Sequence, residues 1–291
     1  MIWLVWRRRR AAMILAGALV VAAGLFLLAV GATGPEIDVR RGPPTPVVLV
    51  RLVMLVLPGV LGIVLGAGLF SRELEQGTHV FTLTQSVSRL RWWATNLLVS
   101  ALPAVVAVAL LSWLAAWSAG GAQHPLVLHT PFFDGSGVLP VVHLLVAFTV
   151  TATVGLVLGN ALAAVAVGVG VVLVAQIVPA AALRPHYLPP QIARADVAVV
   201  ESSVPLGGHQ LDTRFLGADG SPVETAPVRC LLGPGPGSAD CLRRHGIAEV
   251  ELRYQPDSRY WPFQGIEAAP LLALSLLAVG AGWWGLRRRV R

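Results

Sequence analysis

The connector SRELEQGTHVFTLTQSVSRLRWW, Ser71–Trp93, is a polar and basic stretch between two long apolar runs. The chain around it is 55% hydrophobic and only 13% charged, which leaves too little polar surface to cover a water-soluble globule. We therefore predict a membrane-embedded protein, in which this connector lies outside the lipid. A short turn could close the same gap, so the length and polarity of the connector predict a specific role for it.

Outward from the connector, apolar segments long enough to cross a bilayer follow one another along the chain. A helix needs about 20 residues to cross roughly 30 Å of hydrocarbon, because every backbone group must be bonded within its own segment. The sequence therefore predicts an all-α polytopic membrane protein with six transmembrane helices. The predicted spans are Ala11–Ala32, Val47–Phe70, Ala94–Ser118, Val138–Leu158, Ala161–Leu183 and Ala268–Leu286.

The first apolar run follows MIWLVWRRRR, residues 1–10, which raises the alternative of a cleaved signal peptide. Its length exceeds the usual signal core of roughly 7–15 residues, and AVGATG, residues 29–34, offers only a weak cleavage site. We expect a retained helix.

The predicted domain organisation has three parts. Residues 1–183 form a membrane domain of five helices with the connector at 71–93, and residues 184–267 form a small mixed extracytoplasmic segment. Residues 268–291 hold the sixth helix and a tail.

The 184–267 segment is rich in Pro, Gly and charge. GPGPGSAD, Gly233–Asp240, predicts a turn-rich excursion, because repeated Gly and Pro sustain neither a helix nor a central strand. The two cysteines of the chain, Cys230 and Cys241, bracket this excursion on the predicted outer side, where disulfides persist, so we predict a disulfide; the alternative is two unrelated thiols. Their spacing fits no standard zinc-binding pattern without a nearby pair of histidines, and His245 alone does not make such a pair. The β-like runs in this segment are Asp196–Val200 and Ala248–Tyr254.

The arginines indicate how the chain is oriented, and all 22 basic residues are arginine. With the N-terminus in the cytoplasm, eleven arginines fall in inner segments and three in short outer loops, as the positive-inside rule requires. We expect a multi-pass protein of the cytoplasmic membrane with both termini and the connector in the cytoplasm. The inner segments would attract anionic membrane lipid, and no soluble basic face remains for nucleic acid. The inner arginines are Arg7, Arg8, Arg9, Arg10, Arg72, Arg89, Arg91, Arg287, Arg288, Arg289 and Arg291, and the short-loop outer ones are Arg40, Arg41 and Arg51.

Several kinds of chemistry are missing from the chain. Because the sequence has no lysine, a phosphate-binding loop of the form GxxxxGK[ST] is impossible. If ATP powers the protein, another chain binds the ATP and Mg, and we expect no cofactor and no metal in this one. The six spans contain no Asp or Glu on which a transported proton could dwell. Ser100, Ser112 and Ser275 have no His or Asp at comparable depth to activate them, so a membrane enzyme is the weakest functional hypothesis.

Small and hydroxylated residues in the spans predict helix packing. We expect the hydroxyls of the fourth span to bond to their own helix or to a neighbour, which concerns Thr149, Thr151 and Thr153. Two GxxxG spacings are typical of close helix contacts, although 30 glycines also produce chance matches: Gly62/Gly66 and Gly155/Gly159.

The connector is the only inner loop of any length, because the fourth and fifth spans meet across Gly159 and Asn160. A cytoplasmic partner would therefore bind chiefly there. The charged start of the connector extends the second helix. Gly77 then permits a sharp change of chain direction, and a short amphipathic piece follows. We expect its last residues to anchor the third helix at the membrane interface, namely Arg89, Arg91, Trp92 and Trp93. The alternative is an ordinary membrane-surface hairpin.

The stretch RELEQGTHVFTLTQSVSRLRWW, residues 72–93, resembles the signature of permease subunits of type 2 ABC exporters. Ser86 stands where that family commonly has proline, and Asn96 where a lysine often follows. The resemblance implies an elbow followed by a coupling helix, His79–Gln85, that docks into a separate ABC ATPase. It also implies pairing with a second permease, identical or related. The implied ATPase-coupling residues are Arg72, Glu73, Glu75, Gly77, Thr78, His79, Phe81, Thr84, Gln85 and Arg89, of which Glu73, Glu75, Gly77 and Thr78 form the elbow.

A second stretch, YQPDSRYWPFQGIEA at Tyr254–Ala268, resembles the segment before the last helix in an actinobacterial-type branch of these permeases. The leading hypothesis is therefore a permease subunit that exports a substrate with ATP hydrolysed by a partner. The alternative is a membrane sensor or scaffold that transports nothing, whose outer segment, residues 184–267, recognises a ligand.

Overall fold

The computed structural model describes residues 2–33, 45–71, 88–118, 128–197, 209–223, 230 and 238–289. Within these residues, six helices are long and apolar enough to cross a membrane, which confirms the predicted six-helix fold with a small sheet late in the chain. The chain divides into a helical unit (residues 1–122, 130–181 and 264–291) and a sheet unit (residues 123–129 and 182–263). The long helices are α1 (Ile2–Thr33), α2 (Thr45–Ala67), α5 (Arg89–Ser118), α6 (Leu139–Leu158), α7 (Ala161–Val178) and α11 (Tyr260–Arg289).

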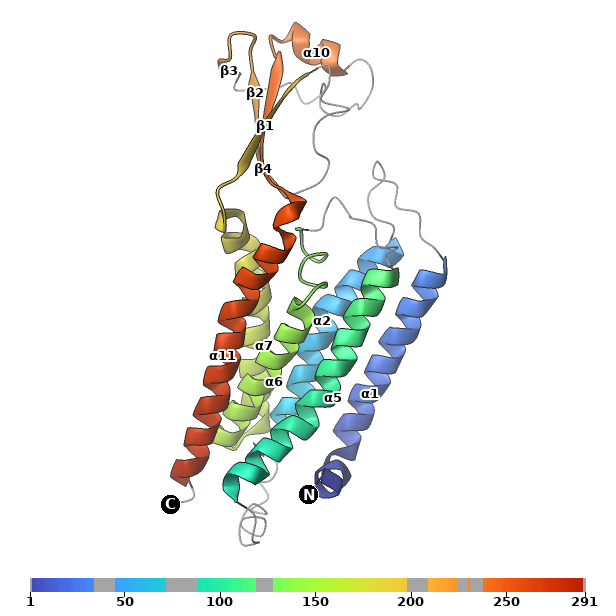
Figure 1. Ribbon diagram of the computed structural model, residues 1–291, viewed down its shortest axis with the longest axis vertical. Helices are drawn as coiled ribbons and strands as arrows, with labels where there is room; N and C mark the ends of the chain where they lie inside the picture. The colour runs from blue at the N-terminus through green and yellow to red at the C-terminus, as the bar shows by residue number, and fades with distance from the viewer. Residues whose placement is uncertain are drawn as a thin grey trace. The chain divides into compact units, whose positions relative to one another are not determined.

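The six helices match the six predicted spans, but α1, α5 and α11 begin earlier than predicted and α7 ends earlier, at Val178. α1 begins at Ile2 because arginine is a good helix former, so the four arginines ahead of the apolar run continue the helix. α11 begins at Tyr260, because Pro262 lies in the first turn, where its missing N–H breaks no helical bond. Figure 1 shows the helices of the helical unit running side by side, with the starts of α1 and α5 and the end of α11 at the same end of that unit.

The contact between α2 and α6 depends on two glycines. A methyl group added to Gly62 would lie 2.6 Å from both the Ala147 Cβ and the Leu144 carbonyl oxygen. A methyl group on Gly66 would overlap the Thr151 side chain. Only glycine lets the two helices approach this closely, which confirms the predicted packing role of the Gly62/Gly66 motif.

The turn between α6 and α7 falls at Gly159 and Asn160, as predicted. Gly159 has a φ of 65°, a left-handed conformation that favours glycine, and its N–H donates to the Gly155 carbonyl at 3.0 Å. The Asn160 side chain then accepts from the Ala163 N–H at 2.9 Å and caps the start of α7. Two residues are therefore enough to reverse the chain.

The threonines of α6 bond as the sequence predicts. Thr149 and Thr151 donate to carbonyls one turn earlier in their own helix, at 2.8 and 2.6 Å. Thr153 donates across to the Ala278 carbonyl of α11 at 2.8 Å. The third hydroxyl thus joins two helices of the helical unit.

The sheet unit holds a four-stranded antiparallel sheet of order β1-β4-β2-β3. β4 matches the predicted run at 248–254, whereas β1 ends at Asp196, where the other predicted run begins, and residues 198–200 lie outside the described part of the chain. β2 was missed because a register shift between Gln210 and Asp212 interrupts its alternation. The strands are β1 (Gln191–Asp196), β2 (His209–Leu216), β3 (Pro222–Val223) and β4 (Glu249–Gln255).

The small core of the sheet unit lies beside a disulfide. The structure joins Cys230 to Cys241 in a disulfide, and Cys230 is 3% exposed and packs with Val197, Leu242 and Val250. Cys241 lies on α10 (Ser238–Arg244), so the end of the predicted Gly233–Asp240 excursion begins a helix, and residues 233–237 lie outside the described residues.

Candidate functional site

Most of the predicted coupling residues lie between residues 72 and 87, outside the described part of the chain. Their roles stay predictions, and Arg89 is the one member of the set that the structure places. The structure places both ends of the 72–87 loop, at Ser71 and Ser88, and these ends form the base of the candidate site. The predicted residues outside the described part are Arg72, Glu73, Glu75, Gly77, Thr78, His79, Phe81, Thr84 and Gln85.

The chain enters the loop from a tightly held segment. α2 ends at Ala67, and the Leu69 N–H donates to the Gly66 carbonyl at 2.9 Å. The Ser71 hydroxyl donates to the Ala67 carbonyl at 2.7 Å. Leu69, Phe70 and Ser71 are almost fully buried, so the last described residues before the loop are fixed within the helical unit.

The chain leaves the loop at Ser88, which caps α5. The Ser88 hydroxyl accepts the Arg91 N–H at 3.4 Å, and its carbonyl accepts the Trp92 N–H at 3.0 Å. Arg89 and Arg91 are exposed in the first turn of α5. Arg89 is therefore free to face a partner, while the helix behind it is held in place.

Four aromatic side chains, Phe70, Trp92, Trp93 and Trp283, form the aromatic base of the loop. The Phe70 and Trp92 ring centroids are 5.3 Å apart, and those of Trp93 and Trp283 are 5.8 Å apart. The first pair joins Phe70, three residues beyond the end of α2, to α5, and the second joins α5 to α11. The guanidinium of Arg287 also lies 4.7 Å from the centre of the Trp283 ring, which adds a cation–π contact.

The aromatic base corrects one expectation from the sequence. Trp92 and Trp93 were expected to anchor α5 at the membrane interface, but they are only 7% and 8% exposed. They are buried because α5 packs on two sides here, against Phe70 on one and Trp283 on the other. Phe70 and Trp283 were not singled out from the sequence, and the signal that could have found them is an aromatic residue at each neighbouring helix end.

The sheet unit contains a cluster of basic groups, in which Arg184 is buried and His129 and His209 are half-buried. Arg184 is 2% exposed and donates to the Leu128 carbonyl at 3.3 Å. The rings of His129 and His209 lie in contact, with nitrogens 3.2 Å apart. Burial lowers the pKa of His209 to about 4, with further contributions from His129 and Arg184. His209 is therefore neutral at physiological pH.

The cysteines could be considered as metal ligands, because Cys230, Cys241 and His245 bring their ligand atoms within 4.8 Å of one another. The disulfide removes both thiolates. His245 instead directs its Nδ1 to the Cys241 carbonyl at 2.8 Å, an acceptor that requires Nδ1 to carry the proton. These residues form a covalent and hydrogen-bonded link that holds α10.

Comparison with known protein families gives one result that bears on the helical unit and its loop. Residues 38–184 match the family described as ABC-2 membrane transporter related. This region is just over half of the chain and includes α2, α5, α6, α7 and the whole 72–87 loop. Comparisons with curated proteins and with solved structures give no match. The six membrane-spanning helices and the family match together show that the chain belongs to the ABC-2 membrane transporter related family and is a multi-pass permease of an ABC transporter.

Proposed function

We propose that the chain is the membrane-spanning subunit of an ABC exporter, driven by ATP that a separate ATPase subunit hydrolyses. The aromatic base carries this proposal, because it connects both ends of the 72–87 loop to α2, α5 and α11. A partner that moves the loop would then move three helices together. The absence of lysine supports the division of labour, since ATP and Mg must be bound by the partner.

In this proposal, the 72–87 loop transmits the movement of the ATPase subunit to the helices of the permease. His79–Gln85 forms the coupling helix, Glu73, Glu75, Gly77 and Thr78 form the elbow, and exposed Arg89 extends the docking surface at the start of α5. Two permeases, identical or related, pair above two ATPase subunits. The ATP-bound ATPase pair must prefer one conformation of the helices, because a partner that binds both equally shifts nothing.

The distribution of arginine supports the orientation of this assembly. Both termini and the 72–87 loop lie in the cytoplasm, the sheet unit lies outside, and the protein resides in the cytoplasmic membrane with lipid around its helices. Export follows as the direction of transport from the resemblance of residues 72–93 to exporter permeases. The 254–268 segment supports placement in the actinobacterial-type branch of the family.

The test is co-purification of the chain with the ABC ATPase subunit that it is proposed to bind. Glu73→Arg and Gly77→Trp should each abolish co-purification, because one reverses a charge of the elbow and the other blocks its redirection. Glu249→Arg is the matched control, since Glu249 is an exposed carboxylate on β4 of the sheet unit. Binding and transport that survive both loop substitutions would remove the proposal.

The alternative function, a sensor or scaffold, is favoured by the folded sheet unit with its disulfide. A deletion strain separates the two functions. An exporter restores substrate efflux only together with an ATPase able to hydrolyse ATP. A sensor restores its response with an inactive ATPase as well.

A further inference from the structure

A cavity of about 760 Å³ lies in the helical unit between α1, α2 and α5. This volume falls in the range of roughly 300–1,000 Å³ that small-molecule sites occupy. The described residues that line it are aliphatic, glycine, proline and methionine, together with one hydroxyl, that of Ser100. No charged side chain is among these lining residues.

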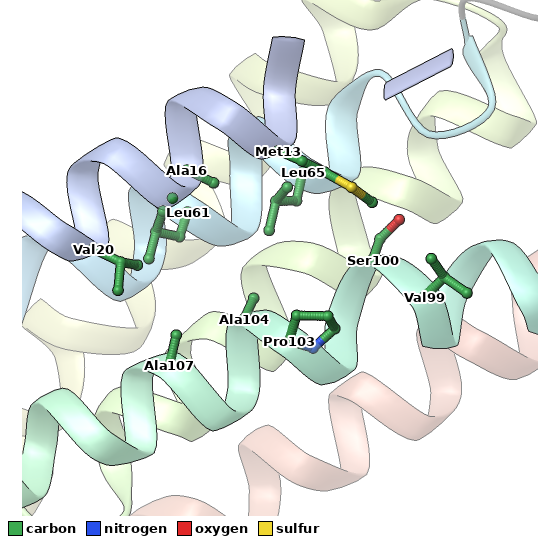
Figure 2. Close-up of a pocket in the computed structure, with 11 residues that line it drawn as sticks. Met13, Ala16, Val20, Leu61, Leu65, Val99, Ser100, Pro103, Ala104 and Ala107 are labelled. Atoms are coloured by element: carbon green, nitrogen blue, oxygen red, sulfur yellow. The ribbon is translucent and has the colours of Figure 1, made fainter. Parts of the chain in front are cut away.

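Ser100 is the unusual member of the lining. It is 3% exposed, and its hydroxyl has no hydrogen-bond partner among the described residues. Two other serines buried in this unit bond back to their own segment, Ser71 to Ala67 at 2.7 Å and Ser275 to Leu271 at 3.0 Å. Figure 2 shows the Ser100 oxygen turned toward the side chain of Met13 across the space between the helices.

A backbone acceptor lies next to this donor. Pro103 is inside α5 and has no N–H, so it cannot donate to the carbonyl of Val99 four residues earlier. Val99, Ser100 and Pro103 all line the cavity (Figure 2). The wall formed by α5 therefore combines the Ser100 hydroxyl with a neighbouring backbone carbonyl that lacks its usual helical donor, in otherwise apolar surroundings.

We propose that this cavity binds an uncharged, largely aliphatic molecule that carries a single hydroxyl or amide, such as a long-chain alcohol or a fatty amide. Its polar group accepts from the Ser100 hydroxyl and donates to the Val99 carbonyl, and its chain occupies the apolar space along α1 and α2. A charged group is excluded, because no lining residue could pair with it. A lone water would find only the lower limit of the two to four polar partners that buried waters have, and it would leave most of the apolar space unfilled.

The proposal is independent of ATP-driven export, and its test uses the purified full chain without any ATPase. The probe is a long-chain alcohol carrying a photoactivatable diazirine, added in nanodiscs, and the readouts are its apparent Kd and the mass-spectrometric position of the adduct. We expect the adduct on the cavity segments of α1, α2 or α5. A matched alkane without the hydroxyl should bind about tenfold more weakly.

Variants test each partner separately. Ser100→Ala should weaken binding of the alcohol by about tenfold and leave binding of the alkane unchanged. Pro103→Ala restores a backbone donor to the Val99 carbonyl and should also weaken binding of the alcohol, by several-fold. Ser112→Ala is the matched control, because Ser112 is also buried in α5 without a partner among the described residues but does not line the cavity.

Two further measurements make the result decisive. Ala104→Trp fills the cavity and should abolish labelling, and circular dichroism shows whether that variant folds; if it does not, the Ser100 and Pro103 variants still carry the test. A ligand that co-purifies with the wild-type chain identifies a resident lipid, whereas a ligand that binds only when added points to a transported compound. Equal binding to wild type and Ser100→Ala would overturn the proposal, and so would adducts outside the cavity. The proposal would also fail if a second copy of the chain filled the cavity.

Discussion

Single residues set how closely the helices of the helical unit approach one another. Gly62 and Gly66 let α2 lie against the backbone of α6, and Thr153 then bonds from α6 to α11. Gly62 and Gly66 act through their small size, and Thr153 acts through its hydroxyl. Such contacts matter because hydrophobic burial does not drive helices together within lipid. α6 is consequently the most buried of the membrane-spanning helices.

The glycine contact yields a prediction about stability. Gly62→Ala should destabilise the helical unit by about 1–3 kcal/mol, because its methyl group would lie 2.6 Å from atoms of α6 that cannot move away. Gly170→Ala makes the same change in α7, where nothing lies within 4 Å, and should be neutral or slightly stabilising. Thermal unfolding in detergent measures both, and equal midpoints for the two variants would contradict the contact.

His209 yields a prediction about pH in the sheet unit. Its folded pKa is lowered to about 4 from 6.5, first by burial and then by His129 and Arg184, so between these values the unfolded chain binds a proton that the folded chain does not. Stability should therefore fall as pH decreases from about 6.5 towards about 4. Hydrogen exchange at the β2 and β4 amides of the full chain, corrected for the intrinsic rate, measures this loss. His209→Gln should flatten the profile, and an unchanged profile would show that His209 is not the group responsible.

At the scale of elements, one side chain connects the start of α6 to α11. Gln264 on α11 is 1% exposed, and its Oε1 accepts from the N–H groups of Val138 and Leu139 at 3.1 and 3.3 Å. Its Nε2 donates to the carbonyls of Phe133 and Ser136 at 3.0 and 3.4 Å. The first N–H groups of a helix have no acceptor within that helix, and the Gln264 side chain supplies one for the first N–H groups of α6.

Gln264→Leu should therefore destabilise the helical unit by about 1–3 kcal/mol, since it leaves buried backbone donors and acceptors without partners. Gln264→Glu keeps the acceptor and removes the amide donors, so its loss should be smaller at a pH where the carboxylate accepts. Thermal unfolding ranks the variants. A Glu variant less stable than the Leu variant would show that charge at this position outweighs the lost hydrogen bonds.

At the scale of the whole molecule, the asymmetry of arginine predicts which side of the membrane each unit faces. Single cysteines can test this in the otherwise wild-type chain, because both native cysteines are held in the disulfide and should not react with a maleimide. Gln85→Cys should react only with a membrane-permeant maleimide in intact cells. Thr213→Cys, on the exposed part of β2, should react with an impermeant one.

The wild-type chain is the control for that experiment and should stay unlabelled until a reductant opens the disulfide. If Gln85→Cys reacted with the impermeant reagent, the loop would face outward. An ATPase in the cytoplasm could not then drive the permease through residues 72–87.

The number of spans, the α6–α7 turn at Gly159 and Asn160, and the loop between α2 and α5 could all be predicted from the amino-acid sequence. These features follow from local properties: the length of an apolar run, the φ of a glycine and the reach of a capping side chain. The aromatic base, the Gln264 cap and the Ser100 cavity arise only when the helices pack against one another. Each of these features joins residues from different helices or depends on which face of a helix its neighbours leave uncovered. No local sequence pattern encodes how the helices pack.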